Sequence, residues 1–327
     1  MLAKPAQSTK SMLSGYLGRR GMTLVESLVA IGIIGLIAAI AIPAVQSSRS
    51  SSRRLACGNQ LRQLGLAAQN YESLHRCFPG ALEPLAQLLP GLEGPDLSQL
   101  TDDEQRQVRF PQFACPADAV AGALGGQAPS YAMNGGVWGK ATGWNGFFTH
   151  SLEPLPGVPS FQIDIFDCVR AADITDGLSN TAMFAERTVF DLRGHAAPVP
   201  DDPVTRLSHA ALVIPGMRQP GQLDIFADQC ERRSVWDPQM FSHFNSNLRG
   251  QQWYNHVLPP NRASCLNGNP LELGVLDYSA VTANSLHPGG VNCLAGDASV
   301  HFVGSGIDRR IWRGLGSRNG NESDTHF

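Results

Sequence analysis

The hydrophobic pattern of this chain begins with one long apolar stretch near the N-terminus. Residues 27–45 include no charged side chain, and Glu26 comes immediately before them. As an α-helix with a rise of 1.5 Å per residue, this stretch would be about 28 Å long, close to the hydrocarbon thickness of a bilayer. The pattern therefore predicts a membrane-spanning helix over about residues 24–45.

A second helical pattern follows after a short polar and basic segment. Its apolar and aromatic positions recur three or four residues apart, which places them on one helix face: Cys57, Leu61, Leu64, Ala68, Tyr71 and His75. Phe78-Pro79-Gly80 is a signal that ends a helix. We therefore expect one N-terminal helix over residues 22–77, with a transmembrane half and an amphipathic half.

Beyond this helix the pattern changes to short β-prone runs between Gly- and Pro-rich segments. The candidate strands are 181–190, 211–214, 291–295 and 299–303. A turn at Gly296-Asp297-Ala298 joins the last two as an antiparallel hairpin. No further long helical period is evident, so the pattern predicts an α+β head over residues 78–327, with the helix packed on an antiparallel β-sheet with long loops.

Composition adds an orientation to this picture. The 327 residues are 43% hydrophobic and 16% charged, and the net charge is −3. Residues 1–21 are basic and contain no acid, so the remainder is acidic overall, which argues against binding to nucleic acid. A basic segment before an apolar helix favours a cytoplasmic N-terminus and an extracytoplasmic head.

The junction between the basic segment and the apolar helix carries a motif. Gly21-Met22-Thr23-Leu24-Val25-Glu26-Ser27, followed directly by the apolar run, resembles the N-terminus of type IV prepilins and type II secretion pseudopilins. The resemblance implies that residues 1–21 are a leader, that a membrane aspartic prepilin peptidase cuts after Gly21, and that the new amine of Met22 is methylated. The leader is longer than in many pseudopilins, and Met22 replaces the Phe that is more usual there.

Glu26 is the chemically unusual residue of this segment, because an ionisable group in a membrane helix costs free energy that a partner must offset. In the pilin families the matching Glu is assigned to pair with the N-terminal amine of a neighbouring subunit, so the resemblance implies an assembly role for Glu26. Two such charges about 4 Å apart attract by about 4 kcal/mol at an effective dielectric constant of 20. Two alternatives stay open: Glu26 lies inert among the headgroups, or the stretch is an ordinary secretory signal cut at Ala39-Ile40-Ala41.

Further motifs run through the rest of the chain. They resemble a large, poorly characterised group of pseudopilin-like proteins that is abundant in planctomycete-type bacteria and has no assigned activity. The matching segments are 57–66, 70–71, 78–79, 113–118, 130–135, 176–181, 287–292 and 312–316. The resemblance implies a pilin-like architecture, in which the long helix lies half in the membrane and half against the head.

Candidate ligands for a metal ion are few. Some pseudopilins bind calcium in a C-terminal loop, and Asp297, Asn292 and Asp176 are the weak calcium candidates of this chain. Calcium takes six to eight oxygen ligands, and these residues supply few, so turn-forming and capping roles are the favoured interpretation. His287 and His301 are further candidates that would converge with Asp297 across the hairpin.

No motif of an enzyme is evident. The sequence contains no HExxH, G-x-S-x-G or C-x-x-C, and the Gly-rich segment 134–141 lacks two required residues of a phosphate-binding loop. We therefore expect a protein without catalytic residues and without a cofactor other than the calcium considered above.

Seven cysteines, at positions 57, 77, 115, 168, 230, 265 and 293, would face an oxidising compartment. They allow up to three disulfides and leave one cysteine unpaired or bonded to another chain. Spacing does not determine the connectivity, and Cys57 on the apolar helix face also fits a small buried hydrophobic residue.

Together these features predict a single-pass protein of the inner (cytoplasmic) membrane with an extracytoplasmic or periplasmic head. The expected function is structural, as a pseudopilin-like subunit or tip component of a type II secretion or type IV pilus-like assembly. Its expected partners are the prepilin peptidase, other pseudopilin subunits, inner-membrane lipid and the secretion assembly platform. The alternatives are a membrane-anchored binding module that does not polymerise and, less favoured, an exported enzyme.

Overall fold

The computed structural model describes residues 22–80, 84–95, 97, 100–101, 104, 108–149, 168–189, 210–213, 216–232, 236–237, 253–268, 278–321 and 327. The chain divides into two compact units, residues 1–49 and 50–327. The expected leader, with the cleavage position Gly21, lies outside the described residues.

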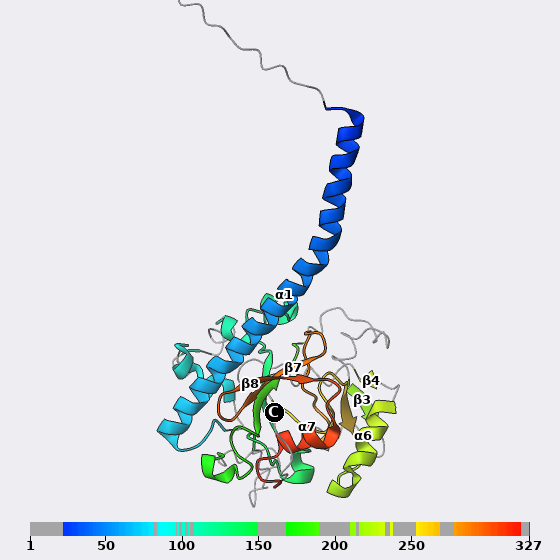
Figure 1. The fold of residues 1–327 in the computed structure, drawn as a ribbon. Helices are drawn as coiled ribbons and strands as arrows, with labels where there is room; N and C mark the ends of the chain where they lie inside the picture. The colour runs from blue at the N-terminus through cyan, green and yellow to red at the C-terminus, as the bar shows by residue number, and fades with distance from the viewer. Residues whose placement is uncertain are drawn as a thin grey trace, which may run out of the picture. The chain divides into compact units, whose positions relative to one another are not determined.

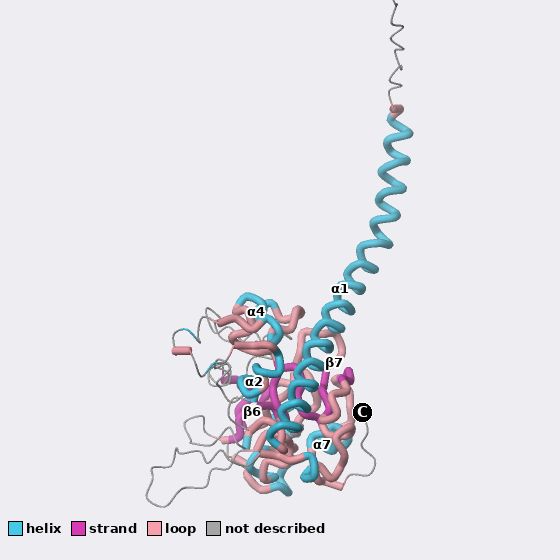
Figure 2. Tube along the Cα trace, turned by 90° about the vertical axis from the view of Figure 1, so that its left-hand side faces the viewer, coloured by secondary structure: helices cyan, strands magenta, loops and turns pink. Residues whose placement is uncertain are grey.

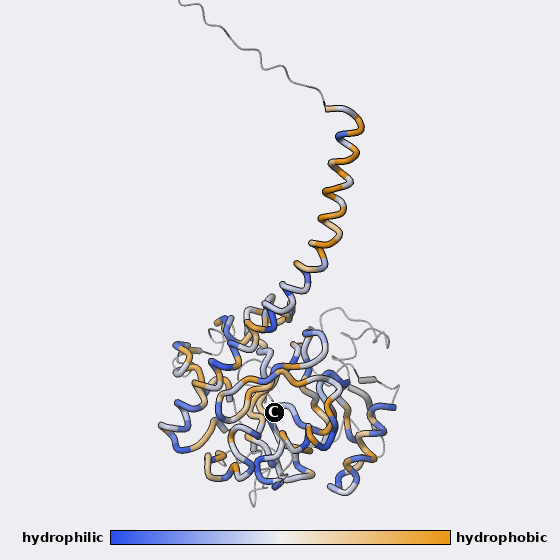
Figure 3. The backbone as a smooth tube through the Cα atoms, viewed as in Figure 1, coloured by the Kyte–Doolittle hydropathy of each residue, from blue (hydrophilic) through white to orange (hydrophobic). Residues whose placement is uncertain are grey.

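Helix α1 (Leu24–His75) confirms the predicted long N-terminal helix and belongs to both units. In the first unit most of its side chains are apolar and exposed, among them Ile33, Leu36 and Ile40. Figure 3 shows this part of the helix as mostly orange, with paler segments between. Among the described residues α1 is long and apolar enough to cross a membrane, which suits a membrane anchor or a signal sequence.

The head, residues 50–327, is built from short helices and strands (Figure 1). Its further α-helices are α2 (Pro84–Gln87), α4 (Ala119–Ala123), α6 (Leu223–Arg232) and α7 (Arg309–Gly316). Its 3-10 turns are η1 (Leu89–Leu92), η3 (Pro111–Phe113), η4 (Gly139–Thr142), η5 (Ala171–Asp173) and η6 (Pro220–Gln222). Its strands are β1 (Tyr131–Asn134), β2 (Ala182–Glu186), β3 (Ala210–Val213), β4 (Trp236–Asp237), β5 (Trp253–Tyr254), β6 (Ser264–Asn267), β7 (Gly290–Ala295) and β8 (Val300–Gly304).

The strands form a five-stranded sheet in the order β5-β1-β2-β7-β8 and a three-stranded sheet in the order β4-β3-β6. Neighbours from β1 to β8 pair antiparallel, as predicted, whereas β5 runs parallel to β1 and β6 runs parallel to β3. In both parallel pairs a long segment separates the two strands in sequence, as a parallel crossover requires. The predicted α+β head with long loops is confirmed, and its sheets are mixed rather than wholly antiparallel.

Strands β1, β2, β5 and β7 of the five-stranded sheet are buried on both faces, whereas the edge strand β8 is partly exposed. Met133, Phe184 and Leu294 belong to a core cluster that includes the apolar face of α1, while Ala132 and Ala185 belong to a cluster that includes Trp312 and Leu315 of α7. Because successive strand residues point to opposite faces, both faces need apolar side chains. Strand β1 is buried throughout and therefore lacks the alternation that identifies a strand in sequence.

The second half of α1 packs against the β7–β8 hairpin (Figure 2). Its buried positions on the predicted face are Cys57, Leu61, Leu64 and Ala68. Gly65 allows a close approach, because a Cβ atom at this position would lie 2.8 Å from Ala298 Cβ and 2.8 Å from Leu294 Cδ1. The amphipathic half of α1 is therefore an integral part of the head.

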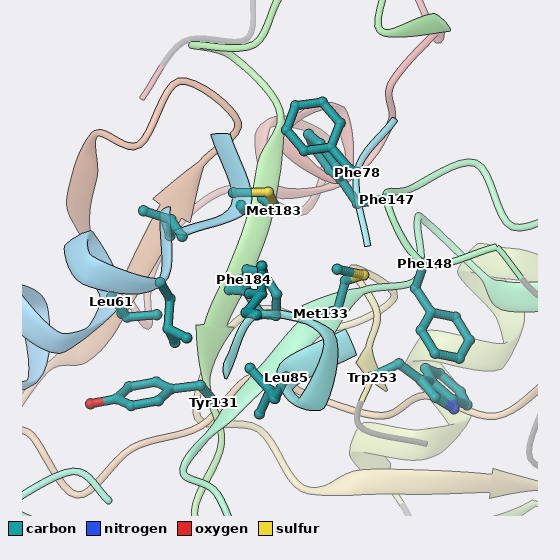
Figure 4. Close-up of a cluster of buried hydrophobic side chains, with 14 of the residues drawn as sticks. Leu61, Phe78, Leu85, Tyr131, Met133, Phe147, Phe148, Met183, Phe184 and Trp253 are labelled. Atoms are coloured by element: carbon teal, nitrogen blue, oxygen red, sulfur yellow. The ribbon is translucent and has the colours of Figure 1, made fainter. Parts of the chain in front are cut away.

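The main hydrophobic core joins α1 to the five-stranded sheet (Figure 4). Leu61 of α1 clusters there with Met133 of β1 and Phe184 of β2. Phe78, just after α1, meets Phe147 edge to face with ring centroids 5.0 Å apart, an arrangement that adds about 1 kcal/mol beyond simple burial. The core thus fixes the start of the head to its central sheet.

Three disulfides connect the head, and Cys293 is a buried free thiol. The pairs are Cys57–Cys115, Cys77–Cys168 and Cys230–Cys265, with Cα–Cα distances of 5.0, 5.7 and 5.7 Å, respectively. These distances lie within the usual range for a disulfide. The first two pairs tie α1 and the residues just after it to the rest of the head.

His256 is buried against α7 in its neutral form. Its Nδ1 lies 2.6 Å from the Trp312 carbonyl oxygen, which only accepts, so Nδ1 carries the proton. Its Nε2 lies 3.1 Å from the Tyr254 hydroxyl and accepts from it. Burial lowers the pKa of His256 to about 3, and the hydrogen bond to Trp312 only partly opposes this effect.

We expect His256 to make the head less stable in acid. Below pH 6.5 the unfolded chain binds a proton on this imidazole while the folded head does not, so its contribution to the free energy of unfolding falls by about 1.4 kcal/mol per pH unit down to about pH 3. Urea unfolding of the full chain at pH 7, 6 and 5 measures the slope. The variant His256→Gln should lose the contribution of His256 to this pH dependence. The same slope in the variant and in the unchanged protein would contradict a low pKa of His256.

Candidate functional site

The first turn of α1 places Glu26 in a capping box with Thr23. Glu26 Oε2 accepts from the Thr23 backbone N at 2.8 Å and from the Thr23 hydroxyl at 2.9 Å. Glu26 N donates in return to Thr23 Oγ1 at 3.2 Å. This reciprocal bonding satisfies N–H groups that a helix start leaves without partners. The Thr-x-x-Glu spacing is the sequence signal for this cap, and the assembly interpretation of Glu26 did not consider it.

The structure places the three calcium candidates in different surroundings. Asp176 accepts from the backbone N of Gly320 at 2.7 Å and of Asn321 at 3.0 Å. Asp297 Oδ1 accepts from Ser299 N at 2.9 Å and from Ser299 Oγ at 2.6 Å. Asp297 therefore has the favoured turn-forming role, Asp176 instead binds the backbone of a C-terminal segment distant in sequence, and calcium binding stays an untested prediction.

The proposed convergence of the hairpin histidines is realised only in part. His301 Nε2 lies 2.8 Å from Ser299 Oγ, which also contacts Asp297, so these residues meet at the turn. His287 contacts Glu186 instead, with 3.1 Å between Nε2 and Oε1. The backbone explains the separation, since His287 precedes β7, whereas His301 lies within β8.

The third calcium candidate, Asn292, belongs to a buried polar cluster centred on Glu186. Glu186 Oε2 accepts from Asn292 N at 2.8 Å, and Oε1 accepts from Asn292 Nδ2 at 2.8 Å. His287 donates to the same Oε1. The side chains of Glu186 and His287 are each only 2% exposed. A buried carboxylate of this kind is tolerated because three donors from the protein replace water.

The Cys57–Cys115 disulfide completes this cluster. Cys115 Sγ lies 3.6 Å from His287 Nε2 and 3.9 Å from Glu186 Oε1. Cys57 comes from α1, Cys115 from the segment after η3, Glu186 from the end of β2, and His287 from the loop before β7. Four distant parts of the sequence therefore meet at one point in the interior. We call Cys57, Cys115, Glu186 and His287 the inner cluster.

Neighbouring hydrogen bonds hold each element of the inner cluster in place. Tyr131, opposite Glu186 in the β1–β2 pairing, donates its hydroxyl to Gln60 Oε1 of α1 at 2.6 Å. Cys115 N donates to Ser130 Oγ at 3.1 Å. His287 N donates to Ser285 Oγ at 3.1 Å. The side chains are thus positioned by β1, by the Cys115 segment and by the loop before β7.

Burial and negative charge also act on the surrounding groups. Burial raises the pKa of Tyr131 well above its usual value, and the charges of Glu186 and Asp118 add to this shift. Asp118 caps α4 and accepts from Val189 N at 2.7 Å, yet burial raises its pKa more than these hydrogen bonds lower it. Tyr131 therefore stays a neutral hydrogen-bond donor beside the inner cluster.

Sequence reasoning missed the inner cluster as a unit. Glu186 is the one acid of the predicted strand 181–190 and is not among the predicted site residues. The sequence marks Cys115 as a candidate for a disulfide and His287 as a candidate ligand near Asp297, and neither prediction includes Glu186. Cys57, Cys115 and His287 lie in separate motifs and Glu186 lies in a predicted strand, and sequence alone does not show that these segments meet.

The inner cluster has the chemistry of a metal site as well as that of a disulfide. One sulfur from each cysteine, a carboxylate oxygen and an imidazole nitrogen all lie within 4.8 Å of one another, and all four residues are buried. In this structure the two sulfurs are bonded to each other. The arrangement therefore stabilises the contact between α1 and the head, and its residue types also suit a transition-metal ion.

Comparisons with known proteins place this chain in a family. No curated protein and no solved structure matches it. A family model described as "Protein of unknown function (DUF1559)" matches residues 46–310. The matched region contains the whole inner cluster and begins directly after the apolar run. Since it covers most of the sequence, the chain belongs to the DUF1559 family.

Proposed function

We propose that this protein is a membrane-anchored, pseudopilin-like structural subunit of a type II secretion or type IV pilus-like assembly. The observation that carries the proposal is the first half of α1, where apolar side chains are exposed along the helix and Glu26 is the one acid at its start. Exposed apolar surface of this extent requires lipid or neighbouring helices to cover it.

The composition of the first half of α1 also suits close packing between α1 helices of different subunits. Gly32 and Gly35 lie three residues apart, and a Cβ atom at either position would meet nothing within 4 Å. Small residues at helical spacing allow the backbones of membrane helices to approach each other. This pair therefore supports a bundle of α1 helices from several subunits.

Processing at the N-terminus would supply the positive partner of Glu26. Cleavage after Gly21 by a prepilin peptidase leaves a methylated amine on Met22, next to the Thr23 N–H that Glu26 already accepts. Glu26 is thus held near the new charge and is available to the amine of its own chain or of a neighbouring subunit. Other pseudopilin subunits, inner-membrane lipid and the assembly platform are the proposed partners.

The proposed location of the head is outside the inner (cytoplasmic) membrane. The basic residues of 1–21 favour a cytoplasmic N-terminus. The three disulfides favour an oxidising compartment for the head. Both lines of support concern different parts of the chain and agree on the same orientation.

Mass spectrometry of the N-terminal peptide tests this function. In membranes from producing cells, we expect the chain to begin at Met22 and to carry a methyl group on its amine. Gly21→Val should block cleavage and leave the leader attached. A chain that begins at Ile42 would show an ordinary secretory signal, and a chain that begins at Met1 would show an uncleaved anchor; either result contradicts the proposal.

A further inference from the structure

The geometry of the inner cluster carries a second inference that does not depend on the proposed function. Zinc in structural sites is bound by four ligands in a tetrahedron, with distances of about 2.3 Å to sulfur, 2.0–2.1 Å to imidazole nitrogen and 2.0–2.2 Å to carboxylate oxygen. Two ligands at these distances are therefore separated by about 3.6 Å for sulfur and nitrogen, 3.6 Å for sulfur and oxygen, and 3.4 Å for nitrogen and oxygen.

The inner cluster matches these separations closely. Cys115 Sγ and His287 Nε2 are 3.6 Å apart, Cys115 Sγ and Glu186 Oε1 are 3.9 Å apart, and His287 Nε2 and Glu186 Oε1 are 3.1 Å apart. The ligand atoms of all four residues lie within 4.8 Å of one another. The three distances among Cys115 Sγ, His287 Nε2 and Glu186 Oε1 are thus already close to those between ligand atoms on one zinc ion.

The edge between the two sulfurs is the disulfide bond, so the oxidised cluster excludes a metal ion. Reduction breaks this bond, and two thiolates on one zinc ion would lie about 3.8 Å apart. Rotation of the two Cys side chains about their Cα–Cβ bonds provides a separation of this size. The remaining ligands need only small shifts.

We propose that, when Cys57 and Cys115 are reduced, the head binds one zinc ion through both thiolates, the Glu186 carboxylate and His287 Nε2. A dithiol reductant gives two electrons and two protons to the disulfide and is itself oxidised to a disulfide. Zinc then displaces the two thiol protons, which pass to the solvent, while the Nε2 proton of His287 moves to Nδ1, so that a neutral imidazole binds zinc through Nε2. The product is a closed site with two sulfurs, one nitrogen and one oxygen.

The surroundings of the cluster favour zinc over calcium. Thiolate and imidazole are ligands for zinc and other transition metals, whereas calcium takes oxygen ligands only. With two thiolates, one carboxylate and a neutral imidazole, the zinc site would carry a formal net charge of about −1. Asn292 donates two hydrogen bonds to Glu186 and orients it as an outer-shell residue does in metal sites.

The inference makes the disulfide and the zinc ion alternative links at the same position. After oxidation the covalent bond connects α1 to the Cys115 segment, and in the reduced state the zinc ion would connect α1 to this segment, to β2 and to the loop before β7. The reduced chain would therefore keep its helix attached to the head without a disulfide.

Metal content of the full chain in detergent tests the inference. Protein produced and purified under reducing conditions should hold one zinc ion per chain by elemental analysis, and oxidised protein should hold none. Cobalt added to the reduced, zinc-free chain should give the visible absorption bands of a tetrahedral site and a charge-transfer band from thiolate. Reduced, folded protein that binds neither ion would overturn the proposal without the need for any variant.

Variants then assign the ligands. Cys57→Ser combined with Cys115→Ser should abolish zinc binding, while Cys77→Ser combined with Cys168→Ser, which removes a different disulfide, should leave it intact. Asn292→Ala keeps all four ligands and should weaken zinc binding by about 10- to 100-fold, measured by competition with a chromophoric chelator. Zinc that persists in the first double variant, or is lost only in the second, would place the ion elsewhere and refute the site. Circular dichroism confirms that each variant is folded.

Discussion

A Glu26→Gln variant is expected to be exported and cleaved normally but to lose assembly. Gln has the same shape as Glu and can still accept the Thr23 N–H, so the capping box at the start of α1 is retained. Only the negative charge disappears. Without an attraction of about 4 kcal/mol between this charge and the amine of Met22, association of neighbouring subunits should weaken by at least about 100-fold.

Crosslinking between cysteines introduced near Met22 measures this association in membranes. Thr23→Val is the matched control, because it removes the hydroxyl from the capping box and keeps the Glu26 charge. We expect crosslinking to persist in Thr23→Val and to disappear in Glu26→Gln. The opposite result would show that Glu26 serves as a helix cap, and normal crosslinking in both variants would leave the chain as an anchored ectodomain that does not polymerise.

Removal of the Cys57–Cys115 disulfide is expected to cause a large loss of stability in the head. The bond closes a loop with a sequence separation of 58, which corresponds to about 4 kcal/mol of chain entropy in the unfolded state. The double variant Cys57→Ala, Cys115→Ala also uncovers the buried Glu186 and His287, which then lose part of their protection from water. Urea unfolding under oxidising conditions, followed by Trp fluorescence, measures the loss.

The Cys230–Cys265 disulfide provides a control for the entropic part. Its sequence separation is 35, so the same entropy argument gives nearly the same loss, about 4 kcal/mol. Cys230 and Cys265 are also buried, but they belong to a different cluster, with Trp138 and Phe226, and not to the inner cluster. We therefore expect the variant at the inner cluster to be the less stable of the two, and a loss no greater than that of the control would mean that the cluster adds nothing beyond the crosslink.

Sequence reasoning was successful where the chain has a simple period. The spacing of Cys57, Leu61, Leu64 and Ala68 identified the buried face of α1, because a helix packed on one side alternates apolar and polar residues every three or four positions. Strands β7 and β8 were found with their turn because the turn residues separate two apolar runs. In these elements local pattern and tertiary packing agree.

Other elements were missed because tertiary packing removes their local signal. Strand β1 is buried on both faces, and helices α6 and α7, of 10 and 8 residues, are too short to show a long helical period in the sequence. The parallel pairing of β5 with β1 depends on residues far apart in sequence. The turn of the last hairpin places Ala298 at a φ of 68°, a left-handed conformation that the sequence does not favour and that packing against Gly65 helps to maintain.

The candidate site residues also differ in how far the sequence alone identifies them. Glu26 and its neighbours form a contiguous motif, so the resemblance selected them directly from the sequence. The inner cluster brings together residues from α1, from the segment after η3, from β2 and from the loop before β7. Each of these residues has an ordinary structural explanation when considered alone, and only the fold shows that their reactive atoms meet.

The two disulfides near α1 also determine how the head responds to mechanical load. Tension that enters the head along α1 reaches Cys57 first, and this residue passes the force through a covalent bond to Cys115. Beyond the end of the helix, Cys77 passes it in the same way to Cys168. The helix segment between these bonds is thus clamped at both ends and does not peel from the sheet one contact at a time, so the head should withstand pulling forces that would unzip a hairpin held by hydrogen bonds alone.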